Sequence, residues 1–246
     1  MYLPPATRAC RQYFPANSSG AAFRDVFTED HVGFKKAGTS FLYKQSLSQK
    51  DHMKILVISD THLPKSDALK DSAGFSFFPE ILQQKIKDAD LIIHAGDFES
   101  EEAYRLFEKT NKLKAVHGNR DEAFLQKLLP QKLIFEQNGF KFGVIHEAGV
   151  SLNDNTARWY ILKEMGVDIL IYGHIHTPMI DEYKNTFLIC PGSPTKARMS
   201  EPSVVEIELD DTQAKTIKDL KVISVGAAAC GYLKFQNALE NKKQDE

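Results

Sequence analysis

Short apolar runs, each followed by polar residues, recur along the chain from Met53 onward. The first is Ile55-Leu56-Val57-Ile58, and an apolar run of this length between polar residues is typical of a strand buried on both faces of a sheet. Segments suited to helices lie between the runs, so the chain is predicted to alternate strands, loops and helices. The predicted buried strands are residues 54–59, 90–93, 113–116, 140–145 and 168–171.

Helix signals separate several of these strands. Ser100 is a suitable N-cap, and acidic residues follow it in the first turn, where they favour the helix dipole. Gly166 is a suitable stop for the last predicted helix, and Trp159 and Tyr160 within that helix are expected in the core. The predicted helices are residues 80–87, residues 100–109, residues 122–128, and a segment capped by Asn153 or Asp154 that runs to Met165.

Turn residues between alternating strands predict three hairpins, of which the one around Asn138-Gly139 has the strongest signal. The predicted hairpin strands are residues 132–136 with 140–145, 179–183 with 186–190, and 203–209 with 214–223. A long loop over residues 60–79 holds Phe75, Phe77 and Phe78. We expect these rings to pack on the core, with an apolar lip beside a site as the alternative.

The two ends of the chain differ from its middle. Residues 1–52 mix Pro, Gly, Ser and aromatic residues without a sustained period, and they carry seven Lys or Arg against four Asp or Glu. We expect them to be a poorly ordered or non-native N-terminal extension, with an organelle transit segment as the alternative. Residues 53–224 are then predicted to form one domain, and residues 225–246 a polar C-terminal tail.

Composition changes this picture little. The 246 residues are 42% hydrophobic and 26% charged, which is ordinary for a globular protein. A net charge of −2 gives no reason to expect a nucleic acid or a membrane surface as partner. No apolar run approaches the ~18 residues of a membrane-spanning helix. Three widely spaced cysteines indicate free thiols in a reducing compartment, which we take to be the cytoplasm.

Polar clusters with ligand-type side chains follow five of the apolar strands. Crevices form at the carboxyl ends of strands in α/β sheets, and alternate residues leaving a strand point to one side, so Asp60 and His62 are expected to reach one cation together. Three clusters begin with Gly, which we expect where the backbone turns sharply. The clusters are Asp60-x-His62, Gly96-Asp97, Gly118-Asn119, His146 and Gly173-His174-x-His176.

These side chains are sufficient for two cations. Imidazole together with carboxylate oxygen suits Mn, Fe, Zn or Ni better than Ca or Mg. Asp97, in the middle of the series, is the natural bridge because each of its two oxygens can bind one ion. Two ions ~3.5–4 Å apart acidify a shared water and hold both oxygens of an in-line displacement, so the pattern indicates hydrolysis at phosphorus.

The same clusters resemble the signature of the calcineurin-like metallophosphoesterase superfamily, and their short spacing resembles its small bacterial and archaeal YfcE-like phosphodiesterase branch. The segments His-Ala-Gly-Asp at 94–97 and Pro-Gly-Ser at 191–193 also match that branch. The resemblance runs from about Met53 to Leu209. It implies an α/β (α+β) four-layer sandwich, in which two mixed β-sheets face each other and are flanked by helices.

When the site residues of the family are matched one by one to this sequence, the resemblance implies two divalent transition-metal ions. Mn²⁺ is favoured, with Fe, Zn or Ni as alternatives. A hydroxide that bridges the two ions is implied to attack the phosphoester in line, without a protein nucleophile. Asp97 is implied to bridge the ions. The implied ligands are Asp60, His62, Asp97 and His176 for the first ion, and Asp97, Asn119, His146 and His174 for the second.

Arg120 departs from the family pattern, which often has His after the Gly-Asn pair. Arginine stays protonated near neutral pH and cannot act as a general acid, but it can bind a phosphate oxygen. We therefore count Arg120 with Asn119 as catalytic and expect Arg120 to steady the substrate phosphate. The alternative is a surface arginine paired with Asp121 or Glu122. Asp121 is expected either to orient a ligand imidazole or to form a salt bridge.

Three further residues need comment. Glu147 follows His146 where the family more often has Gly, and its carboxylate is expected to alter metal preference or hinder the substrate. His94 is expected to have a core or supporting role, and Cys190 no catalytic role.

The sequence thus predicts a hydrolase that acts on phosphoric ester bonds, namely a cytoplasmic phosphodiesterase with a dinuclear metal centre. A non-catalytic interaction scaffold of the same fold, similar to the retromer small subunit, is the alternative. It is disfavoured because every ligand position holds a competent residue. A phosphomonoesterase or protein phosphatase is a third option. The expected partner is a small phosphoester, with no specific nucleic-acid or membrane partner, and a homo-oligomer is compatible with the sequence.

Overall fold

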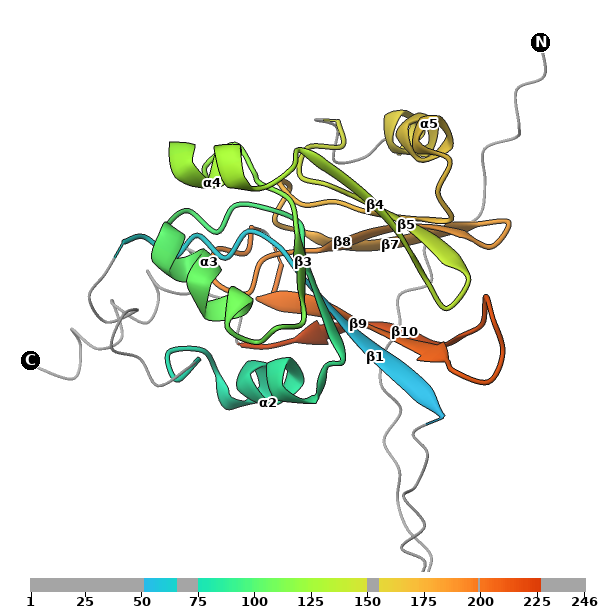
Figure 1. Cartoon of the computed structure of the whole chain (residues 1–246), viewed down its shortest axis with the longest axis horizontal. Coiled ribbons are helices and arrows are strands. Elements are labelled where there is room, and N and C mark those ends of the chain that lie inside the picture. The colour runs from blue at the N-terminus through green and yellow to red at the C-terminus, as the bar shows by residue number, and fades with distance from the viewer. Residues whose placement is uncertain (1–50, 66–74, 150–154, 199, 227–246) are drawn as a thin grey trace, which may run out of the picture. The chain divides into compact units, whose positions relative to one another are not determined.

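Two mixed sheets of five strands each form the body of the described chain (Figure 1). The computed structural model describes residues 51–65, 75–149, 155–198 and 200–226, all within one unit that spans Leu47–Glu246. The first sheet contains β1 (His52–Ile58), β2 (Leu91–His94), β3 (Leu113–Ala115), β9 (Ser203–Asp210) and β10 (Ile217–Ser224), in the order β10-β9-β1-β2-β3. The second contains β4 (Lys132–Gln137), β5 (Phe140–Ile145), β6 (Ile169–Ile171), β7 (Pro178–Tyr183) and β8 (Thr186–Pro191), in the order β4-β5-β6-β8-β7.

Parallel pairs occupy part of each sheet and align several strand ends. In the first sheet, β1 pairs in parallel with β2, and β2 with β3. In the second, β6 lies between β5 and β8 and is parallel to both. The carboxyl ends of β1, β2 and β3 therefore lie at one edge, and those of β5, β6 and β8 likewise.

The three predicted hairpins are confirmed by antiparallel pairs β4–β5, β7–β8 and β9–β10. Asn138 and Gly139 have φ of 47° and 80°, which fits the two-residue turn expected from this dipeptide.

β1 is buried on both faces, as predicted. Ile55 and Val57 belong to an apolar cluster between the sheets, together with residues of β5, β6, β8 and β9 such as Phe142. Leu56 and Ile58 point the other way, into a second cluster beneath helices. Full burial of each such side chain contributes about 1.5–3 kcal/mol to folding, so β1 is a firm base for the loop that follows it.

Helices cover the outer faces of both sheets, which confirms the predicted four-layer fold. The helices are α2 (Glu80–Asp88), α3 (Glu101–Glu108), α4 (Ala123–Leu128) and α5 (Thr156–Met165). Leu82 of α2, Phe107 of α3 and Leu125 of α4 pack into the cluster outside the first sheet, and Leu162 of α5 packs outside the second. The Ser100 side chain accepts a hydrogen bond from the N–H of Ala103, so the predicted cap of α3 is confirmed.

The start of α5 differs from the prediction. Its N-cap position is Asn155, and no side chain forms a cap hydrogen bond there. The amide of Asn155 instead donates to Asp181, and its oxygen accepts from Arg158, so tertiary contacts take the place of the cap. Asn153 and Asp154 lie outside the described residues. The predicted stop at Gly166 is confirmed, with φ of 64°.

Most of the predicted core residues are buried, and the exceptions face solvent. Phe78 is buried and Phe75 packs against the same cluster, whereas Phe77 is 40% exposed. Trp159 packs against the cluster outside the second sheet, but Tyr160 is 67% exposed, so its expected core position was wrong.

The described chain extends slightly beyond the predicted domain bounds. β1 begins at His52, one residue before the predicted start, and pairs there with Asp210 of β9. Val225 is buried in the cluster beneath α2 and α3, one residue past the predicted end. None of the helices within the described ranges is long and apolar enough to cross a membrane.

Candidate metal centre

The loops after five strands bring the predicted ligand residues together. Each residue lies within one to five positions of its strand end, so the buried strands determine where the loops start. The seven residues are Asp60 and His62 after β1, Asp97 after β2, Asn119 after β3, His146 after β5, and His174 and His176 after β6.

Asp60, His62 and His176 form a first group whose ligand atoms all lie within 4.8 Å of one another. The Nε2 atoms of His62 and His176 are 3.1 Å apart, and Oδ1 of Asp60 lies 3.2 Å from the His176 nitrogen. All three side chains are buried. Two imidazole nitrogens and a carboxylate oxygen therefore converge on one point.

A second group contains Asp60, Asp97 and His146 and meets the same 4.8 Å limit. Oδ2 of Asp97 lies 3.3 Å from Nε2 of His146 and 3.5 Å from Nε2 of His62. This single oxygen thus lies near an imidazole of each group. Asp60 also belongs to both groups, so two buried carboxylates join them.

Asn119 and His174 complete the cluster at its outer side. Oδ1 of Asn119 lies 3.1 Å from Nε2 of His146 and 3.1 Å from Nδ1 of His174. The His174 side chain is 32% exposed, unlike the buried histidines. Its ring is 3.7 Å from the largely exposed carboxylate of Glu147, which places that residue at the rim.

Each buried imidazole of the cluster turns Nε2 inward and Nδ1 toward an oxygen. Nδ1 of His146 lies 2.7 Å from the carbonyl of Ala95, and Nδ1 of His176 lies 2.6 Å from the carbonyl of Lys196. A carbonyl only accepts, so the neutral form of each ring holds its proton on Nδ1 and presents the lone pair of Nε2 to a cation. Nδ1 of His62 faces the Glu99 carboxylate at 3.4 Å.

Left-handed backbone brings several ligands into place. Asp60, His62, Asp97, His174 and His176 all have φ between 42° and 73°. Non-glycine residues in this region cost about 1–3 kcal/mol each and persist where surrounding contacts hold them. Asp60 and His62 therefore share one site because the backbone turns at both. The strand alternation expected from the sequence is not the cause.

Glycine has two different uses at the strand ends. Gly96 has φ of 88°, so a sharp turn is confirmed there. Gly118 and Gly173 do not have positive φ, so the predicted reason was wrong for both. A Cβ on Gly118 would lie 2.1 Å from Oδ1 of Asp97, and one on Gly173 would lie 2.0 Å from Oγ of Ser59. Close approach of neighbouring loops requires glycine at these two positions.

The carboxylates give the cluster an unbalanced negative charge. Burial opposes a charged imidazolium at His146, but Asp97 and Asp60 outweigh it and raise the pKa of His146 to about 9. Burial likewise opposes the Asp97 carboxylate, but its contact with His146 holds the pKa of Asp97 below its usual value. Without a bound cation, a proton on His146 therefore supplies the positive charge that balances the carboxylates.

Neither role predicted for Asp121 is the one it has. Its carboxylate accepts hydrogen bonds from the backbone N–H groups of Asp97, Glu99 and Gly118, at 3.1, 2.7 and 2.7 Å. It thus holds the loops after β2 and β3 together. The N–H of Arg120 donates to Oδ1 of Asp97, and in the described residues no ion pair joins the Arg120 guanidinium to Asp121 or Glu122.

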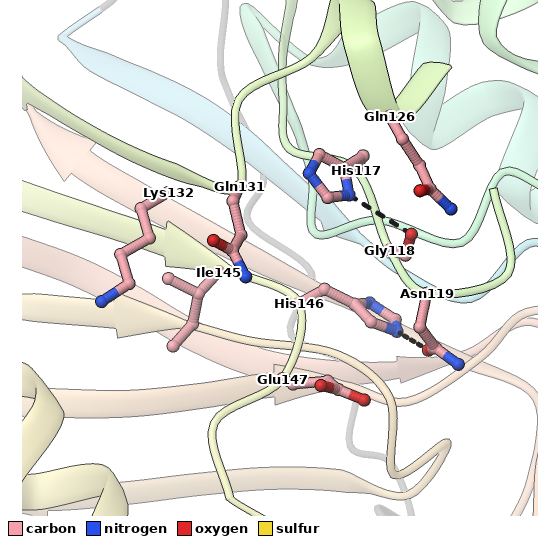
Figure 2. A pocket seen from close by; sticks show the side chains of 9 residues that line it. All are labelled: His117, Gly118, Asn119, Gln126, Gln131, Lys132, Ile145, His146 and Glu147. Carbon is pink, nitrogen blue, oxygen red and sulfur yellow. Dashed lines mark hydrogen bonds between the residues drawn. The ribbon is translucent and has the colours of Figure 1, made fainter. Parts of the chain in front are cut away.

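A polar pocket of about 330 Å³ adjoins the cluster at Asn119 and His146. In Figure 2 these two residues lie together at one end of the pocket, and Lys132 lies at the other. Two glutamines, His117 and Glu147 supply further polar groups, and Ile145 supplies an aliphatic surface.

His94 lies in the core, as expected, and Cys190 is also buried. Burial lowers the pKa of His94, whose ring stacks on Phe98 with centroids 3.6 Å apart. Cys190 is buried, and burial raises the pKa of its thiol to about 12.

Sequence reasoning missed the residues that support the imidazoles. Glu99 and Lys196 lie near His62 and His176 through contacts between loops far apart in the chain. Only the position of Glu99, two residues after Asp97, was a visible signal. The backbone carbonyl of Ala95 carries no signal in a sequence.

Comparison with known proteins gives a consistent result. The family profile described as the calcineurin-like phosphoesterase superfamily domain matches residues 53–212. A probable metallophosphoesterase from Methanothermobacter thermautotrophicus is 35% identical over 184 residues, which are 75% of this chain and 99% of that protein. A probable metallophosphoesterase from Methanocaldococcus jannaschii is 41% identical over 167 residues, which are 67% of this chain and 81% of that protein.

A structural comparison adds evidence on the fold. Vacuolar Protein Sorting 29 from Cryptosporidium parvum matches with a TM-score of 0.55 and 18% identity, over 70% of this chain and 98% of that one. At this identity the likeness concerns the fold alone. The sequence matches carry the assignment, and the predicted resemblance is confirmed. The chain therefore belongs to the calcineurin-like phosphoesterase superfamily, a family of metal-dependent phosphoesterases.

Proposed function

We propose that the chain is a phosphodiesterase with two divalent transition-metal ions, most simply Mn²⁺, bound among the seven clustered residues. The observation that carries the proposal is the arrangement of two buried nitrogen–oxygen donor groups joined by shared carboxylates. Mixed imidazole and carboxylate donors suit Mn, Fe, Zn or Ni.

The electrostatics of the cluster also fit a cation. Two buried carboxylates are difficult to keep charged in a protein interior without a positive partner. A proton on His146 has this role in the ion-free protein, as its raised pKa indicates. A divalent ion would replace that proton with more charge at the same place.

We assign the first ion to Asp60, His62, Asp97 and His176, and the second to Asp97, Asn119, His146 and His174. When bound, the two ions would supply an acidified water as nucleophile and neutralise charge on the phosphoryl group. The chain's own residues then orient the donors: Ala95 and Lys196 fix the rings of His146 and His176, and Arg120 fixes one oxygen of Asp97 through its N–H.

The substrate is proposed to contact Arg120 and the polar pocket. The Arg120 side chain is exposed beside the cluster, and a guanidinium can donate charge-assisted hydrogen bonds to a phosphate oxygen. The pocket beyond Asn119 and His146 would hold one organic group of the ester. Its mixed polar lining favours a group that forms hydrogen bonds over a purely aliphatic one.

Metal analysis and turnover of one aryl phosphodiester test the proposal. The wild-type chain, stripped with a chelator and reloaded with Mn²⁺, is expected to bind two ions and hydrolyse the diester. Asp97→Asn removes a carboxylate near both donor groups, so it should bind at most one ion and lose at least 10²-fold in rate, the scale of electrostatic catalytic contributions. Glu101→Gln, a change at an exposed α3 residue, is the control. A loaded wild-type chain that binds no ions and does not turn over would contradict the proposal.

The Arg120 assignment has its own test. Arg120→Ala is expected to raise KM for the diester with a smaller change in kcat, because the side chain would bind phosphate and transfer no proton. The pH–rate profile should keep its shape. Unchanged kinetics would show that Arg120 is not part of substrate binding.

The same assays separate the alternatives. A phosphomonoesterase would prefer the aryl monoester to the diester under identical loading. A non-catalytic scaffold would hydrolyse neither. We retain the cytoplasm as the proposed compartment on the cysteine pattern. Of the predicted extension 1–52, we propose that residues 1–50, which precede the described start of the domain, are not required for activity.

A further inference from the structure

We propose that Glu99 and Lys196 form a charged pair that positions His62 and sets how tightly the first ion binds. This inference rests on the metal centre proposed above. It concerns two residues outside the ligand set, which lie on loops far apart in the chain and meet beside the cluster.

The first observation is the environment of the His62 ring. Its Nε2 faces the cluster, 3.1 Å from Nε2 of His176, while its Nδ1 lies 3.4 Å from Oε2 of Glu99. A carboxylate behind a ligand histidine fixes the tautomer and makes the ligating nitrogen more basic. Glu99 is therefore placed to act on the metal-facing nitrogen through the ring.

His62 is unusual among the three buried histidines of the cluster. His146 and His176 each turn Nδ1 to a backbone carbonyl, at 2.7 and 2.6 Å. His62 turns Nδ1 to a charged side chain that is 29% exposed. The effect of the Glu99 carboxylate on His62 can therefore change when another charge lies nearby, whereas the effect of a backbone carbonyl on His146 or His176 is fixed.

Lys196 supplies that nearby charge. Its Nζ lies 3.3 Å from the same Glu99 oxygen that faces His62. The backbone carbonyl of Lys196 accepts from Nδ1 of His176. Lys196 thus holds the ring of His176 through its backbone carbonyl. Its ammonium group partly neutralises the Glu99 carboxylate that faces His62.

The loop that carries Lys196 is tied to the cluster. Oγ of Ser193 donates to the carbonyl of Asp60 at 2.7 Å and accepts from the N–H of Lys196 at 2.8 Å. Thr195 donates to the carbonyl of Thr61. The pairing of Lys196 with Glu99 is therefore not a contact between two free surface loops.

Backbone strain at Glu99 is the second observation. Its φ is 84°, a region that glycine occupies at low cost and other residues avoid. The strained residue is held by its N–H, which donates to Asp121, and by its carbonyl, which accepts from Glu122. If this position served only the turn, glycine would be the cheaper residue. The carboxylate therefore has a use that offsets the strain.

These contacts predict that removing the charge of Glu99 and removing that of Lys196 change Mn²⁺ affinity in opposite directions. Glu99→Gln keeps the shape but removes the charge behind His62, so Mn²⁺ should bind more weakly at one site. Loss of such a supporting carboxylate typically costs 10–100-fold in metal affinity. Lys196→Met leaves the Glu99 carboxylate unshared and removes a positive charge near the ion, so it should bind Mn²⁺ at least as tightly as wild type.

Calorimetric titration of the chelator-treated full chain with Mn²⁺ tests the signs. We expect two binding events for wild type, one of them weakened about 10–100-fold in Glu99→Gln with the other retained. Lys196→Met should bind Mn²⁺ no more weakly than wild type at either event. Glu101→Gln is the matched control, because Glu101 is a neighbouring exposed glutamate that pairs with Arg105, and it should match wild type.

Two further measurements separate positioning from folding. Glu99→Gly should be at least as stable as wild type in thermal melts, because it relieves the positive φ, and yet show the same weakened site. In ¹⁵N-histidine spectra of the ion-free chain, the ring signals of His62 should change in Glu99→Gln.

Several results would overturn the inference. Equal Mn²⁺ affinities in wild type and Glu99→Gln would do so while leaving the metal centre intact. A loss of both binding events together with a lower melting temperature would show that Glu99 serves the fold. A wild-type chain that binds no Mn²⁺ would remove the metal centre and this inference together.

Discussion

Single residues at the cluster combine burial, charge and backbone strain. Asp60, Asp97 and three of the four histidines near them are placed in conformations that cost free energy, and the contacts that hold them come from other loops. Asp121 is an example, since its carboxylate joins three backbone N–H groups. The site is therefore preorganised by residues that need not touch a substrate.

The raised pKa of His146 leads to a prediction of how the stability of the ion-free protein depends on pH. Its folded-state pKa, raised to about 9, lies above the unfolded value of about 6.5. The stability that the charged ring contributes is therefore complete below pH 6.5 and disappears as pH rises to about 9. The loss is at most about 3 kcal/mol. Urea unfolding with chelator between pH 6 and pH 10 would measure it.

His146→Gln is the control for this titration. The variant cannot take up the proton, so the decline between pH 6.5 and pH 9 should flatten. A wild-type unfolding free energy that is constant over this range would contradict the pairing of His146 with Asp97 in the ion-free protein.

The identity of the clustered residues was predictable, but their orientation was not. Strand ends followed by Asp, Asn or His were enough to select the seven residues that the structure brings together. The support of each ring was hidden, because Ala95 and Lys196 act through backbone carbonyls that any residue offers. The roles of these residues toward metal ions stay predictions.

At the scale of elements, close approach of loops determines where glycine is required. Gly118 follows β3, and a Cβ there would lie 2.1 Å from the carboxylate of Asp97 and 2.5 Å from its backbone nitrogen. We predict that Gly118→Ala destabilises the fold by about 1–3 kcal/mol and weakens Mn²⁺ binding, because Asp97 must move. Urea unfolding and calorimetric titration would measure the two effects.

Gly166 provides the matched control. It ends α5 with φ of 64°, and a Cβ there would meet no atom within 4 Å. Gly166→Ala should cost about 1–2 kcal/mol through backbone strain and leave Mn²⁺ binding unchanged. Equal metal binding in both variants would show that Gly118 does not determine the position of Asp97.

Element boundaries were predictable where the signal is local. Ser100 caps α3 and Asn138-Gly139 turns between β4 and β5, since both effects involve only adjacent residues. The start of α5 was not predictable, because Asn155 uses its side chain for contacts with β7 and with Arg158. Local propensity fails where tertiary contacts offer the same side chain other partners.

At the scale of the whole molecule, the inter-sheet core should control stability. Phe142 on β5 is fully buried there and stacks on Phe135 of β4, with ring centroids 5.1 Å apart. We predict that Phe142→Ala lowers the unfolding free energy by about 3–5 kcal/mol. Ile134→Ala, at an exposed position of β4, is the control and should stay within about 0.5 kcal/mol of wild type. Similar losses in both variants, measured by urea unfolding, would contradict this placement of the core.

The hydrophobic periodicity of the sequence could not predict how the sheets and helices are layered. A strand such as β1, apolar on both faces, must be covered twice, but its own residues do not say by what. In this chain a second sheet covers one face and helices cover the other. That arrangement depends on pairing between segments as distant as β1 and β9. The family resemblance implied the layers but did not give this pairing.

The domain limits lead to the last prediction. Both sheets and all seven clustered residues lie within residues 51–226, and the family profile matches residues 53–212. The relative from Methanothermobacter thermautotrophicus aligns over 99% of its own length with only 75% of this chain. A polypeptide of this family is thus matched in full without a counterpart for the remaining quarter.

We therefore predict that a chain beginning at Leu47 folds and binds Mn²⁺ like the full chain. Its unfolding free energy should differ by less than about 1 kcal/mol, equivalent to about 2–4 °C in melting temperature for a chain of this size. Thermal melts and Mn²⁺ titration of the two chains side by side measure both quantities. A chain that begins at Val57 is the control, because it lacks most of β1 and should not fold. Loss of metal binding in the Leu47 chain would mean that residues 1–46 support the site, since the strands and donors themselves would be unchanged.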